Sequence, residues 1–326
     1  MNSKNIFSLT HQSDIDGVGS AALIKMNYGI PKKNMFFADY SPANVIRSKQ
    51  EITKAAKSGA VLIIADLGLN EATKQPMLEL INNIKNKNGS VYWFDHHMWN
   101  DGWIKEVASK CDAAIVNENA KYCATEIVRN ELSLNSTFCK KFAQIVHYSD
   151  FNLRPKNKAY MKMIIEYAMS ITSYSQITDY QKRNNKLRHI SDVISKGRLS
   201  DSIIKRDAAK FDKTNTARIK ELVSRRLIVL DKVAVGFQKR VNSTLAGSEI
   251  IKHSGKDIAV YINTDDLHGH IRTKKSDCVK LANYFGGGGH PHAAGFTLKK
   301  KYDFSKESER RNFAMLINKK AKELCR

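Results

Sequence analysis

The strongest constraint on the fold is the order of short apolar runs in the first half of the chain. The run Val61–Ala65 is continuously apolar and partly β-branched, which is typical of a strand buried in a parallel sheet. Stretches with helical spacing separate the runs, as at residues 16–28 and 77–85. Further runs of strand length occur at residues 6–9, 35–38, 91–94 and 113–116. This alternation predicts an α/β domain with a mostly parallel sheet flanked by helices.

The pattern changes twice along the rest of the chain. Residues 140–230 are mainly helical in their spacing, and strand-like segments return after residue 230. We therefore expect a larger N-terminal α/β domain over residues 1–190 and a helical connector over residues 191–232. A smaller mixed α/β domain is expected over residues 233–326.

Bulk composition restricts the class of protein and its partners. Of the 326 residues, 42% are apolar, which is enough for packed cores. Lys and Arg number 54 against 32 Asp and Glu, and the net charge of +22 favours a polyanion such as nucleic acid. A surface that drifted basic with the composition of its genome is the alternative.

Membrane and disulfide classes are disfavoured by the sequence. No apolar run reaches the ~20 residues that a bilayer span needs, and the N-terminus has no secretory leader pattern. The five cysteines are odd in number and lack C-x-x-C spacing, so neither a disulfide framework nor a zinc ribbon is expected. These observations predict a cytoplasmic protein without a membrane anchor.

Four clusters of acidic and histidine residues stand at or just after predicted element ends. Because loops leaving the carboxyl ends of parallel strands converge on one crevice, most of these side chains should meet there. Crowded carboxylates are costly unless cations neutralise them, and carboxylate with imidazole suits Mn²⁺ and similar ions. A single Asp in such a place is often only a helix cap, but the number of ligands fits two metals. The residues are His11, Asp14 and Asp16; Asp66; Asp95, His96 and His97; and Asp150.

These motifs together resemble the DHH phosphoesterase superfamily, in the branch that carries a DHHA1 domain and includes nanoRNase and RecJ-like enzymes. The signature is Asp95-His96-His97 after an apolar run, and Asp14-Ile15-Asp16-Gly17, Ala65-Asp66-Leu67 and Ser149-Asp150 resemble further motifs. Residues 286–290, Gly-Gly-Gly-Gly-His, together with Ala293-Ala294-Gly295-Phe296, resemble the DHHA1 signature. The motifs span residues 11–296, nearly the whole chain.

The resemblance implies a role for each position. His11, Asp14 and Asp66 would hold one divalent metal. Asp16, Asp66, His96 and Asp150 would hold the other, with Asp66 shared. His97 would face the scissile phosphate and Asp95 would orient the histidines. Mn²⁺ is the expected metal, with Mg²⁺ or Co²⁺ as alternatives, and His11 departs from the family's usual spacing to Asp14.

The glycine run has a physical reading of its own. Consecutive glycines let the backbone approach a phosphate closely and can present N–H groups to an anion. The substrate-binding set predicted in the smaller domain is Arg272, Gly287, Gly288, Gly289 and His290. A flexible turn is the alternative for the glycines. Trp99 could stack a nucleic-acid base or pack in the core.

The expected activity is metal-dependent hydrolysis of single-stranded RNA or DNA, or of short oligonucleotides, to 5′-mononucleotides. A phosphodiesterase for cyclic or linear dinucleotides is the first alternative. A nucleic-acid-binding scaffold that kept the fold without catalysis is the second. The manganese pyrophosphatases have a different C-terminal domain, so pyrophosphatase activity is not expected. The sequence leaves open whether the protein is a homodimer.

Overall fold

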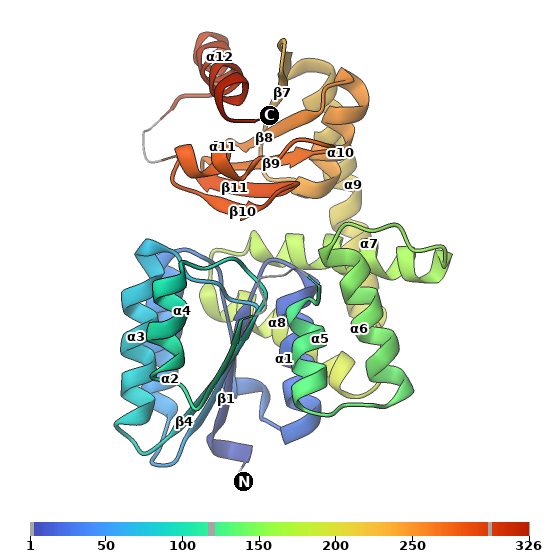
Figure 1. The fold of residues 1–326 in the computed structure, drawn as a ribbon. Coiled ribbons are helices and arrows are strands. Elements are labelled where there is room, and N and C mark those ends of the chain that lie inside the picture. The colour runs from blue at the N-terminus through green and yellow to red at the C-terminus, as the bar shows by residue number, and fades with distance from the viewer. Residues whose placement is uncertain (1–2, 117–120, 299–301, 326) are drawn as a thin grey trace. The chain divides into compact units, whose positions relative to one another are not determined.

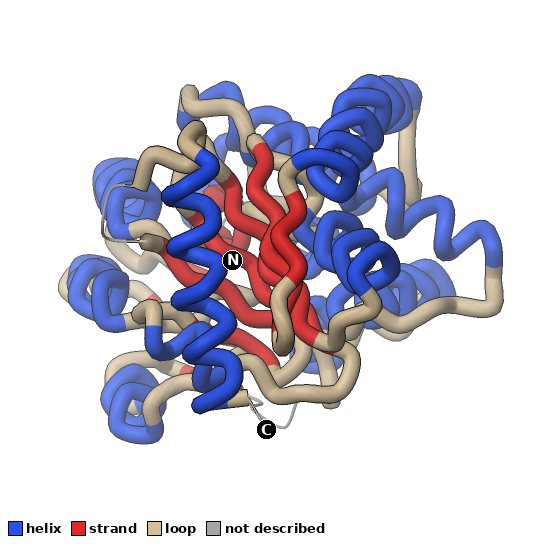
Figure 2. The backbone as a smooth tube through the Cα atoms, turned by 90° about the horizontal axis from the view of Figure 1, so that it is seen from above, coloured by secondary structure: helices blue, strands red, loops and turns tan. Residues whose placement is uncertain are grey.

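The chain forms two compact units, Met1–Ala209 and Lys210–Arg326. The computed structural model describes residues 3–116, 121–298 and 302–325. The boundary between the units falls inside the predicted connector, within helix α9 (Ser202–Arg225). Residues 1 and 326, which end the predicted domains, lie outside the described residues. Figure 2 shows strands with helices around them.

Among the described residues of unit 1, five parallel strands form one sheet in the order β2-β1-β3-β4-β5. The strands are β1 (Ile6–His11), β2 (Met35–Ala38), β3 (Val61–Ala65), β4 (Ser90–Asp95) and β5 (Ala113–Val116). Every residue of β1, β2 and β3 is buried, as expected for strands covered on both faces. The predicted parallel α/β fold is confirmed.

Helices cover both faces of this sheet (Figure 1). Alternate residues of each strand enter two separate cores: Ile63 packs with α1 and α8, whereas Ile64 packs with α2 and α3. The helices of unit 1 are α1 (Ile15–Tyr28), α2 (Pro42–Ala55), α3 (Glu71–Lys85), α4 (Asp101–Ala108), α5 (Ala124–Glu131), α6 (Thr137–Asp150), α7 (Lys158–Ser175) and α8 (Tyr180–Ser195). Short 3₁₀ turns, η1 (Ser3–Asn5) and η2 (Lys32–Asn34), precede β1 and β2.

The strand order reverses direction between β1 and β3. The chain passes from β1 outward to β2 and then returns to β3 on the other side of β1. In an open parallel sheet, the loops that leave two such neighbouring strands turn to opposite faces of the sheet. This opens a crevice at the carboxyl ends of the two strands. His11 ends β1 and Asp66 directly follows β3, so the two residues flank this point.

Unit 2 contains a mixed sheet in the order β10-β11-β9-β8-β7-β6 within its described residues. Only β7 and β8 pair in parallel; the other neighbours in that described sheet are antiparallel. Its elements are β6 (Leu227–Val229), β7 (Val233–Gln238), α10 (Ser243–Ser254), β8 (Ile258–Asn263), β9 (His268–Thr273), α11 (Val279–Tyr284), β10 (Gly288–His290), β11 (Ala293–Thr297) and α12 (Glu307–Leu324). Helices α11 and α12 pack on one face, and α9 and α10 on the other. The predicted smaller mixed α/β domain is confirmed.

No helix in the described parts of the chain is both long enough and apolar enough to cross a membrane.

Candidate metal centre

Side chains from the ends of β1, β3 and β4 and from α6 converge in unit 1. The His11 Nδ1 atom lies 3.1 Å from Asp14 Oδ2 and 3.8 Å from Asp66 Oδ2. The His96 Nε2 atom lies 3.3 Å from Asp66 Oδ1 and 3.5 Å from Asp16 Oδ2. On the other side of the same ring, Nδ1 lies 3.7 Å from an oxygen of Asp150. The six predicted metal ligands are thus brought together around Asp66.

Local backbone signals explain how each ligand is aimed. Asp14 is the N-cap of α1 and accepts hydrogen bonds from the amides of Asp16 and Gly17. Gly17 is required because a Cβ there would stand 2.2 Å from the His11 carbonyl oxygen. Asp66 has a φ of 53°, a left-handed conformation that Asp tolerates better than most residues. This turn directs its carboxylate back over the strand ends.

Asp16 is held by the N-terminus of α5. Its Oδ2 accepts from the Ala124 amide at 2.8 Å and its Oδ1 from the Thr125 amide at 2.7 Å. The Thr125 hydroxyl donates to the Asp16 carbonyl at 2.9 Å. Because each carboxylate oxygen has a second lone pair, Asp16 can still bind a cation. No signal in the sequence linked Asp16 to a segment more than 100 positions away.

Asp95 and His97 form a separate hydrogen-bonded chain beside this cluster. Asp95 Oδ1 lies 2.9 Å from His97 Nδ1, and Oδ2 accepts from the Trp99 indole at 2.6 Å. His97 Nε2 lies 3.0 Å from the Tyr40 hydroxyl. Since both oxygens of the fully buried Asp95 already have donors, it is better suited to orient His97 than to bind a metal.

Trp99 and Tyr40 contact Asp95 and His97, respectively. Trp99 is only 7% exposed and packs edge-on against Trp93, so the structure supports core packing, one of the two roles that the sequence left open for it. Tyr40 follows β2 in a loop whose residues have no motif, and the sequence therefore did not reveal its contact with His97.

The electrostatics of the cluster are those of a site that requires cations. Burial raises the pKa of Asp66 well above its usual value, and the charges of Asp16 and Asp14 raise it further. Burial, followed by the charge of Asp16, raises the pKa of Asp150 to about 8. Lys and Arg form no ion pair with these carboxylates among the described residues. Crowded acids without a basic partner are what a multivalent cation neutralises.

The donor set therefore fits divalent metals. Within the described residues of unit 1, three triads have ligand atoms within 4.8 Å of one another: His11, Asp14 and Asp66; Asp16, His96 and Asp150; and Asp66, Asp95 and His97. The first two contain the six predicted ligands. One buried oxygen of Asp66 and one of Asp150 accept no hydrogen bond from the described residues. Imidazole and carboxylate without thiolate are ligands that several divalent first-row metals accept.

The predicted substrate-binding residues lie together in unit 2. Arg272 on β9 pairs in register with Ala293 on β11, which pairs with His290 on β10. Directly opposed residues of antiparallel strands point to the same face, so Arg272 and His290 share a face with the small Ala293 between them. Their contribution to binding remains a prediction.

The glycine run has a packing cause that the sequence did not show. A Cβ on Gly287 would stand 1.9 Å from the Gly295 carbonyl oxygen, and Gly289 has a φ of 139°. Both glycines therefore permit β10 to lie close to β11. Gly288 is exposed and meets no such obstacle, so packing does not explain why this position is a glycine.

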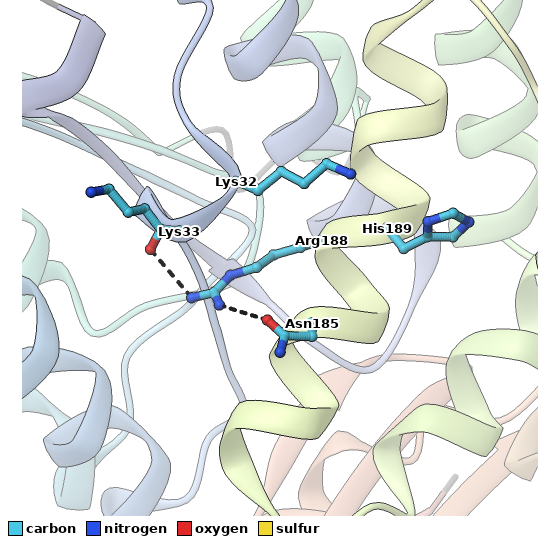
Figure 3. A pocket seen from close by; sticks show the side chains of 5 residues that line it. All are labelled: Lys32, Lys33, Asn185, Arg188 and His189. Carbon is cyan, nitrogen blue, oxygen red and sulfur yellow. Dashed lines mark hydrogen bonds between the residues drawn. The ribbon is translucent and has the colours of Figure 1, made fainter.

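A separate cavity of about 350 Å³ lies near the amino end of β2, away from the metal ligands (Figure 3). Arg188 crosses it and donates to the carbonyls of Met35 and Lys33 and to the side chain of Asn185. His189 Nε2 lies 2.8 Å from Asp201. These side chains already bond to other groups of the protein, so we interpret the cavity as a feature of packing and assign it no ligand. Its lining residues are Lys32, Lys33, Asn185, Arg188 and His189.

Comparison with known proteins identifies the domain and the fold that this chain resembles. Residues 228–323 match the family model of the DHHA1 domain. A solved DHH domain, described as belonging to a family of ribosomal proteins, aligns with 99% of this chain and 87% of its own, at 12% identity and a TM-score of 0.63. No curated protein matches the sequence.

Two further solved structures share the fold. RecJ from Thermus thermophilus, in complex with Mn²⁺, aligns with 98% of this chain at 12% identity and a TM-score of 0.57; the chain spans 52% of RecJ. The pGpG-specific phosphodiesterase of Vibrio cholerae aligns with 96% of this chain and 98% of its own, at 16% identity and a TM-score of 0.54. Residues 228–323 thus match the DHHA1 domain, and the chain shares the fold of these solved DHH-domain, RecJ and phosphodiesterase structures.

Proposed function

We propose that this protein is a two-metal phosphodiesterase that hydrolyses single-stranded or short oligonucleotides to 5′-mononucleotides. The observation that carries the proposal is the convergence of five carboxylates and three imidazoles at the reversal of strand order, without Lys or Arg pairing to the acids among the described residues. Such a set has little use except to hold cations.

His11, Asp14 and Asp66 would hold one metal, and Asp16, His96 and Asp150 the other, with Asp66 within reach of both. Two such ions, when bound, neutralise a phosphate and lower the pKa of water toward neutrality. Mn²⁺ fits the donors, and Mg²⁺ or Co²⁺ are alternatives.

The residues of the chain would do the rest. His97 is held through Nδ1 by Asp95, and this bond leaves Nε2 to face either Tyr40 or a phosphate oxygen. The Trp99 indole donates to the other carboxylate oxygen of Asp95 and holds this carboxylate in place. Asp95 in turn restricts the rotation of the His97 imidazole. The pKa of Asp95 lies below its usual value: burial raises it, but His97 outweighs burial. Asp95 therefore stays ionised and can accept a hydrogen bond from His97 Nδ1.

Dinucleotide hydrolysis is the second candidate. The chain spans nearly all of the pGpG-specific phosphodiesterase but only about half of RecJ. This difference in coverage is the reason to consider a dinucleotide as the substrate in addition to longer strands. The same metal ligands could act on either substrate, because the bond that breaks is a phosphodiester in both. The net charge of +22 supports a nucleic-acid or nucleotide substrate in both cases.

The test is a panel of 5′-labelled RNA and DNA, from dinucleotides to oligomers of about 25 nucleotides, with cyclic dinucleotides alongside. Each substrate is incubated with metal-stripped protein plus Mn²⁺ or Mg²⁺. Glu131→Gln, an exposed acid at the end of α5, serves as the matched control for variants of the metal ligands. Release of mononucleotides from oligomers supports the leading candidate. Cleavage of dinucleotides alone supports the second, and no metal-dependent cleavage of any substrate contradicts both.

A further inference from the structure

Arg272 of unit 2 is a half-buried cation without an acidic partner. Its Nη1 donates to the Ile271 carbonyl at 2.9 Å. Its Nη2 lies 3.5 Å from the Ser243 hydroxyl and 3.3 Å from the Thr244 hydroxyl. No carboxylate in the described residues pairs with it. A guanidinium that is partly removed from water and meets only weak neutral acceptors retains the capacity to bind an anion.

The tip of Arg272 lies at the first turn of α10, because Ser243 and Thr244 are the first two residues of that helix. The amino end of a helix carries a partial positive charge, which makes it an unfavourable place for a cation alone. An anion placed there would meet both the guanidinium and the helix terminus. The position of Arg272 is therefore more favourable with a bound phosphate than without one.

Gly247, one turn further along α10, creates the path for this side chain. A Cβ at Gly247 would stand 2.6 Å from Arg272 Cγ and 2.9 Å from Arg272 Cβ. Both distances are far shorter than van der Waals contact, so the Arg272 stem occupies the space that a side chain on Gly247 would need. Glycine is unfavourable inside a helix, and the clearance supplies a reason for its presence.

We propose that Gly247 is a positioning residue: its missing side chain lets Arg272 lie along α10 and present its guanidinium to a phosphate of the substrate. The inference rests on the proposed function for the identity of that phosphate. The steric contact between Gly247 and Arg272 is independent of it. Arg272 and His290 share one sheet face, so a phosphate at the guanidinium would lie on the side of β9 that also carries His290.

The first experiment tests the contact alone, by thermal melting of four proteins: wild type, Gly247→Ala, Arg272→Gly and the double variant. Glycine at position 272 removes both the Cβ and the Cγ atom that a side chain on Gly247 would meet. Alanine is the better helix former, so Gly247→Ala should raise the melting temperature in the Arg272→Gly background. With Arg272 present, the clash should cancel this gain. Ser248→Ala, on the exposed side of α10, is the matched control and should behave alike in both backgrounds. Equal effects of Gly247→Ala in both backgrounds would overturn the contact.

The second experiment tests the role in binding, through the anisotropy of a fluorescein-labelled short oligonucleotide and through KM and kcat with Mn²⁺. Gly247→Ala should weaken binding and raise KM about 10-fold, the loss of one charge-assisted hydrogen bond, with kcat nearly unchanged. In the Arg272→Gly background it should have no further effect. Unchanged binding by Gly247→Ala would overturn the positioning role. Failure of the wild type to bind any oligonucleotide would refute the proposed function and the phosphate role, whereas the melting cycle would still report the contact.

Discussion

Replacing Asp66 by Asn tests the shared ligand most cleanly. Asp66 has a φ of 53°, and Asn adopts the left-handed conformation as readily as Asp, whereas Ala would add about 1–2 kcal/mol of backbone strain. The amide keeps the size of the side chain and removes the charge. Because burial and neighbouring acids raise the pKa of Asp66, the metal-free variant should be at least as stable as the wild type at pH 8.

The metal-dependent part of stability should behave in the opposite way. A ligand at 100 times its Kd stabilises the folded state by about 2.7 kcal/mol per site, so two sites give about 5 kcal/mol. For a unit of the size of Met1–Ala209, each kcal/mol raises the melting temperature by about 2–4 °C. We therefore expect Mn²⁺ to raise the wild-type melting temperature by roughly 10–20 °C. Asp66→Asn should lose most of this shift, since both sites share the residue.

The assay is differential scanning fluorimetry of metal-stripped protein across a Mn²⁺ titration, with hydrolysis of a labelled oligonucleotide in parallel. Turnover by Asp66→Asn should fall at least ~100-fold. Even the mutation of residues that only hydrogen-bond to metal ligands commonly lowers activity about 10–100-fold. Glu131→Gln should retain the full shift and full activity. A variant that keeps both the Mn²⁺ shift and the activity would refute Asp66 as the shared ligand.

Three further predictions concern the surroundings of the site. The pKa of Asp150 is raised to about 8 in the folded state, so its ionisation favours the unfolded state. The stability of the metal-free protein should therefore fall as pH rises from about 4 to about 8. Asp150→Asn should flatten this decline in thermal melts with EDTA, and an unchanged slope would contradict the raised pKa of Asp150. Trp99→Phe removes the indole bond to the buried Asp95 and should lower kcat about 10–100-fold with little change in Mn²⁺ affinity; wild-type kcat would show that Asp95 needs no such support. Thr125→Val removes the hydroxyl bond to the Asp16 carbonyl and should cost about 1–2 kcal/mol in urea unfolding, while the two backbone bonds keep Mn²⁺ affinity within a few-fold; loss of metal binding would mean that the hydroxyl, rather than the helix terminus, fixes Asp16.

The sequence predicted the described strands of unit 1 and the residues that follow them, because both depend on local patterns. The short strands β6 and β10 of unit 2 were not predicted. Val61–Ala65 could be recognised as a buried parallel strand from its composition, and the position of Asp66 just after it followed directly. Parallel strands place their carboxyl ends at one edge, so the meeting of His11, Asp66 and His96 was also predictable.

Contacts between distant segments could not be predicted in this way. The N-terminus of α5 reaches Asp16 across more than 100 positions, and Tyr40 reaches His97 from a loop without a motif. Helices α2 and α4 were not identified. The glycine run shows a different limit, because an anion-binding loop and a closely packed strand require the same residue. Only the distance from Gly287 to Gly295 revealed the packing cause.

The central claim is that one site holds two divalent metals, and anomalous diffraction from Mn²⁺-soaked crystals of this protein tests it most directly. We expect two peaks in unit 1, one between His11, Asp14 and Asp66 and one between Asp16, His96 and Asp150. A single peak, or peaks away from these residues, would contradict the two-metal site.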